Sequence, residues 1–329
     1  MIELNHDELV IHFPEVHEEA RIEIHFQRTL RIPDDGRTYP LPAGLGRFPL
    51  RHVDDHARTV PVPWIEHGGV MLPMYQAEAL WLCFQGHYPF AIKVAAGKIN
   101  AVTGEEWRDG LHRDPQDYLV TPNQPWLDGY SVERGVIRQF VAMPLGEGYT
   151  AEEQITGRGV VGGLQIVAYP MKREVFERYG RAARRAVLYL GATRVTGSAD
   201  MGLAPGGRMH QEIYQDHHAL EDWDQRHRAR CFVQIANAPQ WRAITGDAPP
   251  TEPITAAHYR EAGIPWFDYY AADLAAVEGA GILQRLKSVV EMGKAKREAP
   301  VPQNDPIVID RVVDLRRGLK RSEVREGVF

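Results

Sequence analysis

Apolar and polar residues alternate along much of the first half of the chain. In the segment 21–26, Ile22, Ile24 and Phe26 fall on one face of an extended strand. Longer apolar runs at 135–143 and 164–169 begin at glycine and end at proline, which is typical of buried strands. Gly97 between two short apolar runs predicts a β-hairpin. We therefore predict that the chain up to about residue 172 is a mostly antiparallel sheet.

The pattern changes after Pro170. Apolar residues recur at helical spacing over 171–186, and a strand is expected at 187–195. The glycines within 202–207 predict a loop, and 231–235 reads as a short strand. Thr255 is placed to cap a helix over 256–262, and Asp268 to cap another. The predicted fold class is α+β, with a β-rich N-terminal half and a mixed helical C-terminal region.

These patterns suggest three parts: a β-rich domain (1–172), a mixed α/β region (173–292) and a C-terminal tail (293–329). The tail holds nine Lys or Arg against six Asp or Glu, too small a surplus for a nucleic-acid arm. Its apolar spacing, from Ile309 to Leu315, must be buried somewhere. We expect the tail to dock on a partner subunit, so that the protein is a homo-oligomer.

Composition and charge narrow the class of protein. Apolar residues make up 44% and charged residues 25%, as in an ordinary globular protein. The formal net charge of −6 makes nucleic acid an unlikely partner. Cys83 and Cys231 lie in apolar segments and are predicted to be buried, reduced thiols. Without a signal-peptide pattern or an apolar run of membrane-spanning length, we expect a soluble cytoplasmic protein with no membrane association.

A tetrapeptide pattern occurs three times: proline, tryptophan, any residue, and then Asp or Glu (Pro-Trp-x-acid). In an extended segment the indole and the acid share a face, which suits a sugar ring or a cation. The alternative is a packed tryptophan followed by an acid that caps a helix or turn. The candidate ligand-binding residues are Trp64, Glu66, Trp126, Asp128, Trp266 and Asp268.

A group of histidines within a polar stretch forms a candidate metal site. Imidazole and nearby carboxylates are suitable ligands for zinc or iron. The spacing matches no H-E-x-x-H motif, and a polar stretch of this kind is commonly a solvated surface segment. The candidate ligands are His210, His217, His218 and His227.

Other motifs argue against familiar chemistry. Residues 157–162 match G-x-G-x-x-G, yet they lead into a predicted strand, whereas a dinucleotide-binding loop opens a helix. No G-x-S-x-G nucleophile motif is present. Thr150 and Glu153 have the spacing of a capping box, which explains the paired acids Glu152 and Glu153 without catalysis.

Two functional hypotheses follow. The first is a self-associating structural or ligand-binding protein without catalysis, because nothing reactive lies in the long Pro/Gly segments. The alternative is a metal- or carboxylate-based hydrolase acting on a polar small molecule or carbohydrate, with Trp126 and Asp128 near its pocket. Whether the protein is an enzyme, and in which biological process it acts, is left open by the sequence.

Overall fold

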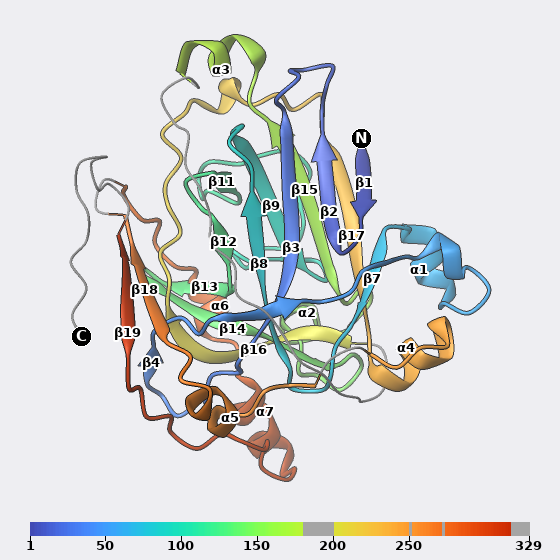
Figure 1. The fold of residues 1–329 in the computed structure, drawn as a ribbon, viewed down its shortest axis with the longest axis vertical. Coiled ribbons are helices and arrows are strands. Elements are labelled where there is room, and N and C mark those ends of the chain that lie inside the picture. Colours follow the sequence, from blue (N-terminus) through green and yellow to red (C-terminus); the bar gives the residue numbers. More distant parts are fainter. Residues whose placement is uncertain (180–200, 250–251, 272–273, 317–329) are drawn as a thin grey trace.

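Two large β-sheets dominate the chain in the computed structural model, which describes residues 1–179, 201–249, 252–271 and 274–316 (Figure 1). The larger sheet has the strand order β1-β2-β3-β8-β14-β16-β4, with β5 beside β3, β12 beside β8 and β13 beside β14. Its strands are β1 (Ile2–Asn5), β2 (Glu8–His12), β3 (Arg21–Thr29), β4 (Thr38–Tyr39), β5 (Gly44–Arg47), β8 (Ala79–Gln85), β12 (Trp126–Leu127), β13 (Gly129–Glu133), β14 (Val136–Pro144) and β16 (Met201–His210).

The second sheet has the order β10-β9-β15-β17-β7-β6, with β11 beside β9. A separate parallel pair, β18 with β19, lies near the C-terminal end. These strands are β6 (Arg51–His52), β7 (Val70–Pro73), β9 (Phe90–Ala96), β10 (Ile99–Asn100), β11 (Leu119–Thr121), β15 (Leu164–Pro170), β17 (Ala229–Ala236), β18 (Trp266–Tyr270) and β19 (Val312–Arg316).

Most neighbouring strands in the two large sheets run antiparallel, which confirms that part of the predicted fold class. The parallel pairs there are β16 with β4 and β17 with β7. The predicted hairpin forms between β9 and β10, and Gly97 has the positive φ that the turn needs. The predicted strands at 21–26, 135–143, 164–169 and 231–235 are also present.

The main hydrophobic core lies between the two sheets. Phe26 and Leu82 of the larger sheet belong to the same buried cluster as Ile92 and Ile166 of the smaller one. Because side chains alternate between the faces of a strand, the odd-numbered residues of β3 and β8 lie on the opposite, outer face of the larger sheet. A second cluster, which includes Tyr259 and Trp266 from the C-terminal part, packs against that outer face.

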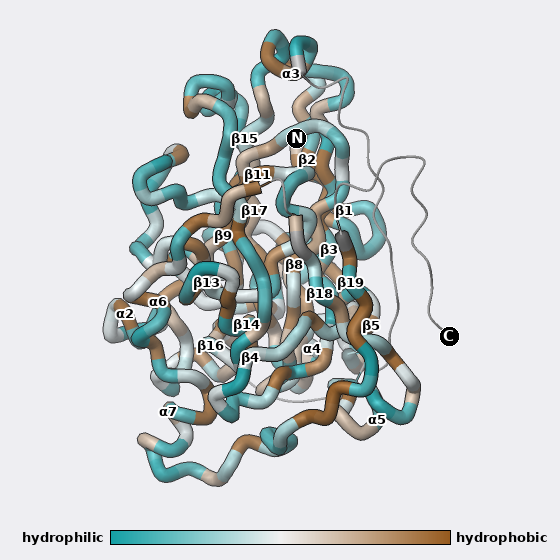
Figure 2. Tube along the Cα trace, turned by 90° about the vertical axis from the view of Figure 1, so that its left-hand side faces the viewer, coloured by the Kyte–Doolittle hydropathy of each residue, from teal (hydrophilic) through white to brown (hydrophobic). Residues whose placement is uncertain are grey.

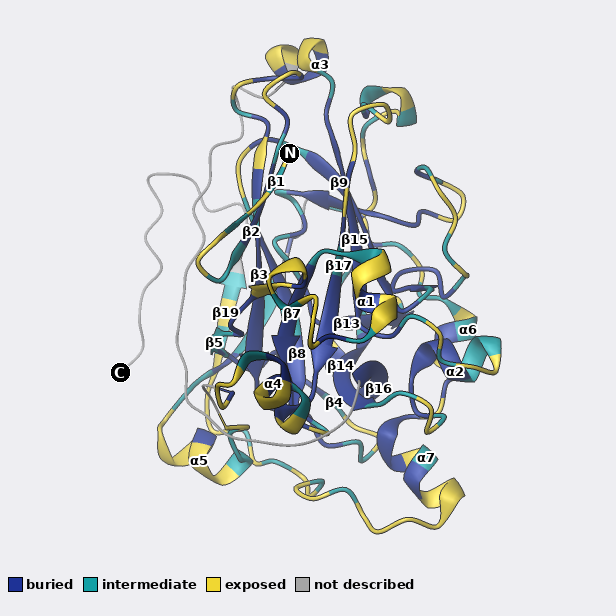
Figure 3. Cartoon of the chain, turned by 90° about the vertical axis from the view of Figure 1, so that its right-hand side faces the viewer, coloured by how far each residue is buried: buried dark blue, intermediate teal, exposed yellow. Residues whose placement is uncertain are grey.

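The helices are short and lie around the sheets. Exposed residues gather on these helices and on loops, whereas the strands are largely buried (Figure 3), and hydrophilic residues line the outer loops (Figure 2). The predicted helical C-terminal region is therefore only weakly supported. The helices are α1 (Val62–His67), α2 (Ala151–Thr156), α3 (Arg173–Tyr179), α4 (Ala238–Thr245), α5 (Ala256–Glu261), α6 (Gly281–Gln284) and α7 (Val289–Lys296), with 3₁₀ turns at Asp54–His56 and Leu220–Asp222.

Two element predictions are wrong. The segment 202–207, predicted as a loop, lies inside β16, because its glycines let other backbone approach closely: a Cβ on Gly207 would lie 2.4 Å from the Pro33 carbonyl oxygen. Asp268, predicted to cap a helix, lies in β18 and is paired with Asp314 of β19. The capped helix at Thr255 is confirmed as α5, and the strand predicted at 187–195 lies outside the described residues.

Both large sheets take strands from either side of residue 172, since β16 pairs with β14 and β17 pairs with β15. The division into separate domains remains a prediction.

In the tail, Ile309 packs against the second cluster of the same chain, so part of the apolar stripe is covered without a partner subunit. Among the described residues, no helix is long and apolar enough to cross a membrane.

Candidate functional site

The outer face of the larger sheet carries a group of side chains that strand pairing brings together. Trp81 of β8 lies opposite Gln27 of β3, and Cys83 lies opposite Trp126 of β12. Asp128 follows Trp126 by two residues, so an extended chain turns both side chains to the same face. The strand register alone therefore gathers an amide, a thiol, two indoles and a carboxylate on one patch.

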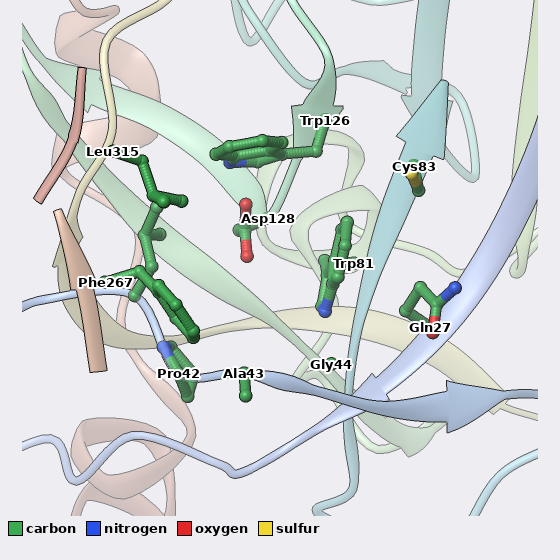
Figure 4. A pocket seen from close by; sticks show the side chains of 11 residues that line it. Gln27, Pro42, Ala43, Gly44, Trp81, Cys83, Trp126, Asp128, Phe267 and Leu315 are labelled. Atoms are coloured by element: carbon green, nitrogen blue, oxygen red, sulfur yellow. The ribbon is translucent and has the colours of Figure 1, made fainter. Parts of the chain in front are cut away.

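A second layer of chain covers this patch and leaves a cavity of about 290 Å³. The segment between β4 and β5 forms one wall, and β18 and β19 contribute Phe267 and Leu315 (Figure 4). The β4–β5 segment is held to β18 by reciprocal backbone hydrogen bonds between Leu41 and Phe267, each 2.8 Å long. We call this space the Asp128 cavity; it is lined by Gln27, Leu41, Pro42, Ala43, Gly44, Trp81, Cys83, Trp126, Asp128, Phe267 and Leu315.

Among the described residues that line the cavity, Asp128 is the only one with a carboxylic acid or a basic group in its side chain. Its side chain is held by Gln211, whose Nε2 donates to Oδ2 at 2.6 Å while its Oε1 accepts the Asp128 backbone N–H at 3.0 Å. Burial raises the pKa of Asp128 to about 7, and the hydrogen bond from Gln211 lowers it in part. The carboxyl group therefore changes its charge near neutral pH.

Five other buried carboxylates show what a fully satisfied acid looks like here. Glu78 accepts from the Arg28 guanidinium and from the Tyr75 N–H. Both oxygens of each acid in this group accept hydrogen bonds, from cations, hydroxyls, an indole or backbone amides; the group is Glu78, Asp117, Glu152, Glu153 and Asp216.

Asp128 differs from them. Within the described residues, its Oδ1 accepts no hydrogen bond, and Asp128 takes part in no ion pair. Oδ1 is not one of the fully enclosed side-chain atoms that lack a partner, so part of its surface is open to a donor. The cavity is the place from which a donor could reach this oxygen.

A second polar atom of the cavity wall also has no partner. The indole Nε1 of Trp81 is buried and donates to nothing among the described residues. The Trp81 ring meets Trp126 edge-to-face, with centroids 6.2 Å apart, and Trp126 packs on Tyr269 with centroids 4.8 Å apart. The cavity thus combines aromatic surface with the free acceptor of Asp128, whereas the unpaired Trp81 N–H is enclosed in the wall, where a water-sized molecule does not reach it.

Gly44 allows the Trp81 indole to occupy its position. A Cβ on Gly44 would lie 2.9 Å from Cζ2 of Trp81, closer than side-chain carbons approach one another. The Trp81 ring therefore lies directly against the bare backbone of β5. A larger residue at position 44 would displace the indole, and both residues line the cavity.

The three Pro-Trp-x-acid copies do not converge on one site. Trp126 and Asp128 line the Asp128 cavity. Trp64 is buried in a separate cluster beside α4, and Glu66 is exposed on α1. Trp266 is buried in the second cluster and does not line the cavity. Asp268 faces His210, with 3.6 Å between Oδ1 and Nδ1.

The candidate metal ligands are likewise dispersed. His218 packs against Trp223, His227 pairs with Asp224, and His217 is exposed. In the described part of the chain, the one group of three possible ligand atoms close enough to share an ion is Glu8, Glu23 and His25, on β2 and β3. Zinc or iron binding by His210, His217, His218 and His227 remains a prediction.

The G-x-G-x-x-G segment binds a carboxylate of its own chain. Glu152 accepts from the backbone N–H groups of Val161 and Gly162. Glu153 accepts from Gly146, Gly148 and Thr150, so the predicted capping box is confirmed. Both acids are engaged by backbone amides, in keeping with a structural role.

Sequence reasoning missed most of the cavity. Gln27, Trp81 and Cys83 alternate with core residues in strands, and this alternation marks them as facing away from the main core. No local signal shows that Phe267 and Leu315 cover them, because those residues follow Trp81 by more than 180 positions.

Comparison of the chain with protein-family models, with curated proteins and with solved structures finds no match.

Proposed function

We propose that this protein binds a small organic molecule in the Asp128 cavity. The observation that carries the proposal is the buried Asp128 carboxyl group, which has one oxygen held by Gln211 and the other without a donor on the wall of an aromatic cavity. Small-molecule sites are typically concave and mostly apolar, with a few polar groups that fix orientation. A ligand that donates to Asp128 would complete its hydrogen bonding.

The size and lining of the cavity limit the ligand. At about 290 Å³ it has the volume of roughly ten water molecules, room for a single ring with a short substituent. Trp81, Trp126 and Phe267 offer flat surfaces for such a ring.

Binding without catalysis fits this lining better than hydrolysis. Among the described residues, Asp128 is the one carboxylate that lines the cavity. Burial raises the pKa of the Cys83 thiol to about 12, which keeps it protonated and a poor nucleophile. Hydrolysis assisted by carboxylates ordinarily needs a second acid or base, or a metal-bound water. Self-association remains a separate prediction.

A cavity-filling substitution tests the proposal. Benzyl alcohol and benzylamine each carry one ring and one short polar group, and their binding is measured by calorimetry and by ligand-detected NMR. We expect at least one of them to bind the wild-type protein. Gly44→Val should weaken that binding by about tenfold or more, because the new side chain collides with Trp81 and enters the cavity.

Gly281→Val is the matched control. Gly281 lies at the start of α6, where an added Cβ meets only the Arg285 guanidinium at 3.6 Å. This variant should bind the probes as the wild-type protein does. If neither probe binds, or if Gly44→Val binds as tightly as Gly281→Val, the cavity is not the binding site that we propose.

A further inference from the structure

We propose that the ligand of the Asp128 cavity is a protonated amine carried on an apolar or aromatic skeleton. This inference rests on the proposed function, because it names the class of molecule that the cavity selects. It goes beyond size and shape by assigning a charge to the ligand. Three features of the described residues support it.

The first feature is the missing countercharge. Where this chain buries a carboxylate beside a cation, the two form a short ion pair, as Glu78 does with Arg28 at 2.6 Å and Asp117 with Lys93 at 2.7 Å. Buried acids without a cation, such as Glu152, accept hydrogen bonds on both oxygens instead. Asp128 is equally buried, with 3% of its surface exposed, and has neither an ion pair with any described residue nor a donor on Oδ1. A buried charge is expensive unless it is paired, so a positive group inside the cavity would balance Asp128.

The second feature is the aromatic lining. Figure 4 shows the Asp128 carboxyl group beside the rings of Trp126 and Trp81, with Phe267 on the covering layer. Indole faces attract cations more strongly than other aromatic side chains do, and the attraction grows where water is excluded. A cation that reaches Asp128 from the cavity would lie among these rings.

The third feature is that the free oxygen of Asp128 is a hydrogen-bond acceptor. An ammonium group is a donor only, and the free oxygen of Asp128 is an acceptor. A hydrogen bond between an ammonium and a carboxylate is roughly twice as strong as one between neutral groups. An alcohol could fill the same position, but it would leave the carboxylate charge unbalanced.

Matched probes separate the charge of the ligand from its shape. Benzylamine and benzyl alcohol differ in the group attached to the same benzyl skeleton, and at pH 7.5 the amine is protonated. For the wild-type protein we expect benzylamine to bind about tenfold or more tightly than the alcohol, because only the amine forms a charge-assisted bond to Asp128. Asp128→Asn should bring the two dissociation constants to within about twofold.

Asp268→Asn is the control for loss of an acid near the cavity. Asp268 lies on the covering strand β18, has a side chain that is 43% exposed, and does not line the cavity. It should keep the wild-type preference for benzylamine. Thermal unfolding followed by circular dichroism shows that each variant is folded before its binding is compared.

The outcomes distinguish the two proposals. If both probes bind equally to the wild-type protein, and Gly44→Val abolishes both, the cavity binds ligands but the amine assignment is wrong. If Asp128→Asn keeps the preference for benzylamine, the assignment is also wrong. If neither probe binds to any variant, the proposed function fails together with the assignment.

Discussion

Burial of the Asp128 carboxyl group lowers the stability of the unliganded folded protein, and the size of this effect depends on pH. This group is buried among aromatic side chains, with Gln211 as its one hydrogen-bonding side chain. Other buried acids of this chain, such as Glu78 and Asp117, have cations as partners. A residue that destabilises the unliganded protein in this way is typical of binding sites, where interactions are completed by the ligand.

We predict that Asp128→Asn stabilises the unliganded protein at pH 8. The pKa of Asp128 is raised from 3.8 to about 7. At a pH between these two values, the folded protein is protonated at Asp128, whereas the unfolded protein has already released this proton. Stability from this group is therefore fully present below about pH 4, is lost as the pH rises towards 7, and stays low above it. The variant should be more stable by up to about 4 kcal/mol at pH 8.

Urea unfolding of both proteins at pH 8 and pH 5 measures this difference. The advantage of the variant should shrink at pH 5, where the wild-type folded protein is already protonated at Asp128. A variant that is equally stable or less stable than the wild type at pH 8 would show that Asp128 is not the unpaired buried acid described above.

At the scale of elements, several glycines of this chain allow close packing as well as turns. The G-x-G-x-x-G segment turns its backbone amides onto Glu152, and Gly97 of the β9–β10 hairpin lies against the same side chain. A Cβ on Gly97 would lie 2.4 Å from Glu152 Oε2. Glu152 thus joins α2 to the hairpin and to the loop before β15.

We predict that Glu152→Gln destabilises the protein by about 1–3 kcal/mol, because the amide loses the charge that the backbone N–H groups bind and brings an NH₂ group towards them. Urea unfolding at pH 7 measures the loss. Glu147→Gln is the control, since Glu147 has 60% of its side chain exposed. Equal stability of the two variants would contradict the structural role of Glu152.

Local patterns predicted the strands of the first half and the caps at Thr150 and Thr255, but not the position of Asp268 in a strand or the glycine-rich segment 202–207. The alternation at 21–26 and the capping signals at Thr150 and Thr255 depend on neighbours in sequence, and the structure confirms them. Gly206 and Gly207 lie in a strand because Val141 and Pro33 approach them from other parts of the chain. Sequence spacing contains no information about that approach.

At the scale of the whole molecule, the cavity is a product of long-range pairing. Trp126 and Asp128 could be predicted as a pair on one face, and both line the cavity. The strand register adds Gln27, Trp81 and Cys83, and the C-terminal strands add the cover. The cover forms only because β19 pairs with β18, and no sequence pattern near either strand indicates that pairing.

A crystal structure of the wild-type protein soaked with benzylamine tests the central claim most directly. We predict that the amine nitrogen lies within about 3.2 Å of an Asp128 carboxylate oxygen, the distance of a hydrogen bond. The benzyl ring should lie against Trp126 and Trp81. Benzylamine found in the cavity with its nitrogen turned away from Asp128, or bound only outside the cavity, would contradict the claim.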